Sequence, residues 1–135
     1  MKWLLLIFIA NTICAQTKKD SLLIGTKKFG VQFIYDGYGK LKISKQGKIY
    51  SIKGEQYSKL KDEYCIIDGT LEALTPASLK FNGQIKLLTK DCCGEVIKNG
   101  NFTFVSSGKR KFWRLQERSE LCDEYKCCYY LDIFK

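Results

Sequence analysis

Residues 40–53 read KLKISKQGKIYSIK, and this stretch carries the pattern that predicts the fold. Leu41 and Ile43 alternate with lysine and serine, a polar segment with a glycine follows over residues 45–48, and the alternation resumes over residues 49–53. Successive side chains of a β-strand point to opposite faces of the sheet, so this alternation predicts two half-buried strands. The stretch is therefore predicted to form a β-hairpin.

The same pattern recurs along the rest of the chain. Short alternating stretches are separated by Gly, Asn and Asp at a spacing of about ten residues, and little of the sequence has a helical period. Asn82-Gly83 and Asn99-Gly100 each lie between two such stretches and are predicted to be two-residue hairpin turns. The sequence predicts an all-β domain of about 8 to 10 strands, either an antiparallel β-sandwich or an up-and-down barrel.

The last stretch, residues 129–134, is apolar on both of its predicted faces. Leu131 and Ile133 would lie on one face, and Tyr130 and Phe134 on the other. A strand that buries both faces is expected in the middle of a sheet rather than at its edge.

Residues 1–15 have the features of a cleavable signal peptide. Lys2 precedes an uncharged apolar run over residues 3–10, and Ala15 is a small residue at the expected cut site. At about 1.5 Å per residue this run is too short to cross a bilayer core of about 30 Å. Lipidation of Cys14 is an alternative, which Ile13 disfavours because lipoprotein signals place a small residue before the cysteine.

This interpretation divides the chain into a removed leader, residues 1–15, and a single β-domain, residues 16–135. The mature protein is expected in the periplasm or outside the cell, with no transmembrane segment. Richness in Lys, Ile and Asn suggests a bacterial source.

The cysteines predict a disulfide-stapled domain. Cleavage after Ala15 removes one of the seven cysteines, and an even number in an exported chain favours disulfides. Six cysteines allow 15 pairings, and the sequence does not choose among them. Our hypothesis bonds the vicinal pair 92/93 to the vicinal pair 127/128, and Cys65 to Cys122. The spacing includes no C-x2-C and the chain has no histidine, so a metal site is not expected. The disulfide candidates are Cys65, Cys92, Cys93, Cys122, Cys127 and Cys128.

The composition argues against an enzyme. Without histidine the chain cannot build Ser-His-Asp or Cys-His catalytic groups. It also has no P-loop, no G-x-G-x-x-G and no G-x-S-x-G sequence. Carboxylates near residues 117–132 could form a glycosidase pair, but solvated loop carboxylates are the ordinary case. We expect neither catalytic residues nor a cofactor.

The charge is strongly positive and uneven. The net charge of +9 becomes +8 without Lys2, and residues 17–62 alone contribute +7. Such a surface is predicted to attract an anionic partner, such as an envelope polysaccharide, lipid headgroups or an acidic protein. The alternative is that solvated lysines only protect strand edges.

Residues 109–117, KRKFWRLQE, interleave basic and aromatic side chains. Such a segment can bind single-stranded nucleic acid or a sugar, although export argues against nucleic acid. In the alternative interpretation Trp113 packs in the core while Arg114 faces outward. The candidate partner-binding residues are Lys109, Arg110, Lys111, Trp113 and Arg114.

Together these features predict an exported, non-enzymatic β-domain that binds an anionic or protein partner through a basic surface. One alternative is an inhibitor or immunity-type protein whose charged loop, residues 117–126, blocks a secreted enzyme. Another is a lipocalin-like carrier of an apolar ligand, although Gly30-Val31-Gln32 does not match the lipocalin G-x-W sequence.

Overall fold

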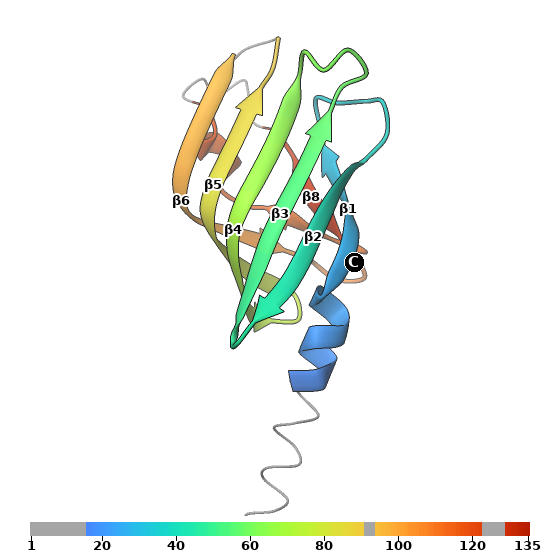
Figure 1. Cartoon of the computed structure of the whole chain (residues 1–135), viewed down its shortest axis with the longest axis vertical. Coiled ribbons are helices and arrows are strands. Elements are labelled where there is room, and N and C mark those ends of the chain that lie inside the picture. The colour runs from blue at the N-terminus through green and yellow to red at the C-terminus, as the bar shows by residue number, and fades with distance from the viewer. Residues whose placement is uncertain (1–15, 91–93, 123–128) are drawn as a thin grey trace, which may run out of the picture.

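The computed structural model describes residues 16–90, 94–122 and 129–135 (Figure 1). Its eight strands each pair antiparallel with the next, and the last pairs with the first to close a barrel. The all-β prediction is confirmed, and the closed barrel decides between the two architectures. The strands are β1 (Gly25–Val31), β2 (Gly39–Gln46), β3 (Ile49–Tyr57), β4 (Tyr64–Thr75), β5 (Ser78–Leu88), β6 (Glu95–Val105), β7 (Phe112–Leu115) and β8 (Leu131–Phe134), with a 3-10 turn η1 (Arg118–Glu120) before β8.

Two local predictions are confirmed. Residues 40–53 form the β2–β3 hairpin, in which Gln46 pairs with Ile49 and Gly47 takes a positive φ of 64° at the turn. The C-terminal strand β8 lies between β7 and β1, as its two apolar faces predicted.

The two Asn-Gly turns were predicted wrongly. Gly83 and Gly100 lie in the middle of β5 and β6, where they pair with each other, and Gly83 also pairs with Gly69 of β4. A Cβ atom on Gly83 would lie 2.2 Å from the carbonyl oxygen of Asp68, and one on Gly69 would lie 2.3 Å from that of Asn82. The backbones approach so closely here that glycine is required for packing rather than for a turn.

The number of paired residues between neighbouring strands varies around the barrel. β5 and β6 pair over eleven residues each, whereas β6 and β7 share only the pairs Phe104–Leu115 and Val105–Arg114. Two further bonds extend this contact, because Thr103 N–H donates to the Glu117 carboxylate at 2.7 Å and Gln116 N–H donates to the Thr103 carbonyl at 2.8 Å. We call this short contact the β6–β7 seam.

Large apolar side chains fill the interior of the barrel. The largest fully buried ones are Trp113, Phe29, Phe81 and Phe104. Residues 16–23 are helical and cover one end of the barrel, where Leu23 enters the core (Figure 1). This helix is too short to cross a bilayer.

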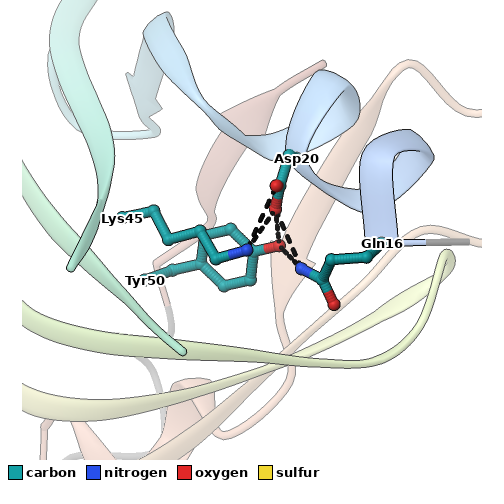
Figure 2. Close-up of polar contacts among 4 residues, drawn as sticks. All are labelled: Gln16, Asp20, Lys45 and Tyr50. Carbon is teal, nitrogen blue, oxygen red and sulfur yellow. Dashed lines mark hydrogen bonds and ion pairs between the residues drawn. The ribbon is translucent and has the colours of Figure 1, made fainter. Parts of the chain in front are cut away.

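Polar side chains tie this helix to the β2–β3 hairpin (Figure 2). Asp20 accepts a 2.5 Å hydrogen bond from the Tyr50 hydroxyl and bonds of 3.0 and 3.1 Å from Lys45. The Gln16 amide donates to both Asp20 and Tyr50, at 3.0 and 3.1 Å. The hydrogen bonds from Tyr50 and Lys45 hold the pKa of Asp20 below its usual value. Burial, followed by the bond to Asp20, raises the pKa of Tyr50 to about 12.

Tyr50→Phe is expected to make stability less sensitive to alkali. The folded pKa of Tyr50 is about 12, above the unfolded value of about 10. The stability that neutral Tyr50 contributes is therefore complete below pH 10 and lost as the pH rises toward 12. Urea unfolding between these pH values should show a shallower decline in the variant than in the wild type. Tyr57→Phe, on the outer surface, is the control and should keep the wild-type slope; equal slopes for wild type and Tyr50→Phe would contradict the prediction.

The predicted bond between Cys65 and Cys122 is wrong. Cys65 is a free thiol with no exposed surface, because it points from β4 into the core, and this burial raises its pKa. The other proposed disulfide partners, at positions 92, 93, 127 and 128, lie outside the described residues, as does the predicted signal peptide.

Candidate binding face

Four exposed lysines stand on the outer face of β1, β2 and β3 in cross-strand pairs. Lys28 lies directly opposite Lys40, and Lys42 lies directly opposite Lys53. Like charges opposite each other on neighbouring strands are destabilising. An acidic residue borders each pair, but within the described part of the chain the only ion pair of these lysines is the long one from Lys53 to Asp68, at 3.9 Å. We call this set the lysine face.

Arg114 organises the neighbouring outer surface of β7 and β8. Its guanidinium makes two hydrogen bonds to the Asp132 carboxylate, at 2.8 and 2.9 Å, and these raise the pKa of Arg114. It also lies 4.0 Å from the ring centroid of Tyr130 and 4.9 Å from that of Phe112. A cation held against aromatic faces is stabilised by the ring quadrupoles. Arg114 is thus fixed in place with its own charge balanced by Asp132.

Two further arginines extend this stack at its ends. Arg118 lies 4.0 Å from the Tyr130 ring, and Arg110 lies 5.6 Å from the Phe112 ring. Neither forms an ion pair with a described residue. We call the five residues Arg110, Phe112, Arg114, Tyr130 and Arg118 the arginine–aromatic stack. Within the described ranges, two of its three positive charges have no ion-pair partner.

A groove of about 420 Å³ adjoins the stack, and Arg114 and Tyr130 form part of its wall. Tyr38 packs edge-on against Phe134 at 5.1 Å above Gly30, where a Cβ atom would lie 3.1 Å from the Phe134 ring. Tyr38 is 60% exposed and Tyr35, also in the groove, is 90% exposed. The groove therefore presents open aromatic surface.

Lys28 joins the two surfaces, because its ammonium lies 5.3 Å from the Tyr38 ring. The lysine face, the groove and the arginine–aromatic stack thus adjoin one another across strands β7, β8, β1, β2 and β3. We call the whole the binding face.

The structure separates the five residues that the sequence proposed. Arg110 and Arg114 both belong to the stack, and Lys109 and Lys111 are exposed beside it. Trp113 lies on the opposite side of β7, fully buried, and its indole N–H donates to the Pro76 carbonyl at 3.1 Å. It therefore fits the core-packing interpretation and takes no part in this surface.

Sequence reasoning missed the residues that complete the face. Asp132 and Phe134 reach it from β8, and Tyr130 lies directly before that strand; only the β7–β8 and β8–β1 pairings bring them there. The surplus positive charge of residues 17–62 did indicate a lysine-rich surface. It did not show which of the lysines lie on the same surface.

The proposed inhibitory loop is described only up to residue 122. Its first residue, Glu117, supports the fold, because its carboxylate accepts the Thr103 N–H at the β6–β7 seam. Among the described residues no three acidic or cysteine side chains gather as metal ligands would.

A small antiparallel barrel with a filled interior and a basic, aromatic outer face defines the structural class of this protein. The chain belongs to the PM1083 family, whose model matches residues 11–135. One relative, the uncharacterized protein PM1083 of Pasteurella multocida (strain Pm70), is 31% identical over 125 residues, which cover 87% of this chain and 76% of the relative. No solved structure matches the chain significantly.

Proposed function

We propose that this protein is a non-enzymatic binding domain that recognises an acidic protein through its binding face. The observation that carries the proposal is the arginine–aromatic stack, in which Arg114 is held between Phe112 and Tyr130 while Arg110 and Arg118 form no ion pair with any residue that the structure describes. Tyrosine and arginine are the side chains that most often dominate the binding energy of protein interfaces.

The stack is suited to binding because its guanidinium groups are already ordered. A free arginine loses side-chain entropy when it binds, whereas one stacked on a ring loses less. The open groove beside it offers Tyr35 and Tyr38 as apolar contacts. This aromatic content favours a protein over a simple polyanion as the partner.

The lysine face adds long-range attraction. Cross-strand lysine pairs have an electrostatic cost in the free protein, and an acidic partner would reduce it. Attraction of this kind mainly accelerates association and weakens as salt is added. Binding is therefore expected to be salt-dependent.

The test combines crosslinking with charge reversal. A photo-crosslinking residue at Tyr38, in producing cells, should capture an acidic protein, whereas one at Ile97, which is 50% exposed on β6, should not. The double variant Arg110→Glu/Arg118→Glu should lower affinity for the captured protein by about tenfold or more, with an unchanged melting temperature.

The matched control is Lys18→Glu/Lys98→Glu, which changes the net charge equally away from the binding face. It should keep near-wild-type affinity. Equal losses in both variants, or equal capture at Ile97 and Tyr38, would contradict a defined binding face.

We also propose that residues 1–15 direct export and that the mature domain holds at most two disulfides. The support is the apolar leader and the cysteine count: six cysteines remain after cleavage, and the buried free Cys65 leaves five. Alkylation of the folded, non-reduced protein should leave Cys65 unmodified until denaturant is added, and mass spectrometry after denaturation should count no more than four cysteines in disulfides. A third disulfide, or an intact leader on the exported protein, would contradict this proposal.

A further inference from the structure

Three glycine-centred segments lie side by side in β4, β5 and β6. They are residues 68–70, 82–84 and 99–101, and pairing places Gly69, Gly83 and Gly100 in one row. The residues that flank the glycines are all exposed and can all form hydrogen bonds. We call these six side chains the polar band; they are Asp68, Thr70, Asn82, Gln84, Asn99 and Asn101.

The fold explains the glycines but not the polar band. Close backbone approach requires Gly69 and Gly83, whereas the flanking positions point outward and could hold any strand-forming residue. Asn and Asp are depleted in strands, where β-branched residues are favoured. Positions at which local sequence rules fail without a packing reason are often functional.

One edge of the polar band opens into a cavity of about 440 Å³. Thr70, Asn82 and Asn101, paired in one cross-strand row, form part of its wall. The amide groups of Asn82 and Asn101 make no hydrogen bond with any described residue. Neutral donors and acceptors are therefore available to a ligand.

Three lysines from different segments line the same cavity: Lys19 of the N-terminal helix, Lys48 of the β2–β3 turn and Lys80 of β5. None of them forms an ion pair within the described part of the chain. Glu72, opposite Lys80, is the one acidic residue among those lining the cavity. The cavity therefore has a surplus of positive charge.

Part of the cavity wall is held in place by the network of Figure 2. Gln16 and Tyr50 line the cavity, and their bonds to Asp20 fix the helix against the hairpin. A cavity with ordered walls loses less entropy when a ligand binds.

We propose that this cavity and the polar band bind an acidic oligosaccharide. The lysines would take its carboxylates, and the row of Thr70, Asn82 and Asn101 would take its hydroxyls, because side-chain amides and sugar hydroxyls both donate and accept hydrogen bonds. Neighbouring strands lie about 4.8 Å apart, so the row presents one polar side chain at each such step. A regular series of this kind suits a polymer of repeating units better than a single phosphate. The site uses other residues than the binding face and does not depend on it.

The probe is tetragalacturonate, and neutral maltotetraose is the comparator, each titrated by calorimetry into the mature domain. We expect the wild type to bind tetragalacturonate at least about tenfold more tightly than maltotetraose. Asn82→Val/Asn101→Val and Lys48→Gln/Lys80→Gln should each weaken binding by about tenfold with an unchanged melting temperature. The valine replacements remove the hydrogen-bonding groups, and because valine is favoured in strands they should preserve the fold.

The matched control is Lys40→Gln/Lys42→Gln, which removes the same charge from the lysine face and should keep wild-type affinity. Failure of the wild type to bind the probe would overturn the proposal. Loss of binding in the control but not in Lys48→Gln/Lys80→Gln would do so too. Full affinity in Asn82→Val/Asn101→Val would reduce the site to simple charge attraction and overturn the carbohydrate assignment. Arg110→Glu/Arg118→Glu should bind the probe normally, so this proposal and that of a protein partner fail independently.

Discussion

Replacing Gly83 with valine is expected to prevent stable folding. A Cβ atom there would lie 2.2 Å from the Asp68 carbonyl oxygen and 2.6 Å from the Cα of Gly69, so the obstacle is backbone that cannot rotate away. The β4–β5 pairing would have to separate at its centre, in the longest pair of strands of the barrel. We expect a loss of about 4 kcal/mol or more in the free energy of unfolding, measured by urea titration with circular dichroism.

Gly47→Asn is the control for this prediction. Gly47 has a φ of 64° in the β2–β3 turn, and a Cβ atom there would meet nothing within 4 Å. Asparagine tolerates this left-handed conformation, so the change should cost well under about 1 kcal/mol. A stable Gly83→Val barrel would show that the close approach of β4 and β5 is not required.

Trp113→Ala is expected to cost about 3–5 kcal/mol of stability. Trp113 is fully buried in the barrel interior, and its removal would leave a large cavity and an unpaired Pro76 carbonyl. Trp113→Phe keeps most of the volume and should lose less than half as much, including about 1 kcal/mol for the hydrogen bond. Both values can be measured by chemical unfolding followed by circular dichroism.

The same pair of variants tests where the functional surface lies. Because Trp113 points away from the arginine–aromatic stack, Trp113→Phe should leave crosslinking from Tyr38 unchanged. A marked fall in capture with a folded protein would place Trp113 in the binding machinery, contrary to its position in the core.

Local patterns in the sequence predicted strands but not their closure. The alternation of residues 40–53 is sufficient for a hairpin, because both strands and the turn lie within one short segment. The β1–β8 pairing that closes the barrel joins Gly30 to Asp132 across most of the chain. An alternation of polar and apolar residues does not show which distant strand pairs with a given strand. The sequence therefore could not distinguish a sandwich from a barrel.

The Asn-Gly pairs show a second limit. Glycine in a strand pattern can signal a turn or a close backbone approach, and the two have the same local sequence. Here the deciding fact is the register that aligns Gly69, Gly83 and Gly100 across three strands. Register is a property of pairing and is not visible in one strand alone.

The sequence predicted the basic and aromatic character of the candidate site and part of its location. The segment at residues 109–114 did contain Arg110 and Arg114, and strand alternation accounts for the inward position of Trp113. The rings of Tyr130 and Tyr38 that complete the face come from distant segments. Their contribution depends on tertiary contacts that the sequence does not reveal.

The β6–β7 seam gives the barrel a preferred site of local opening. Two paired positions and the bonds at Thr103 hold β6 to β7, whereas eleven paired positions hold β5 to β6. Far fewer hydrogen bonds must therefore break to open the seam. Parts of a protein with few backbone bonds open at a lower free energy than the rest. The amide protons of β7 should therefore exchange with solvent sooner than those at the centre of β5. Because β7 carries Arg114, a partner that binds this arginine only in the closed barrel would raise the free energy of local opening and slow the exchange.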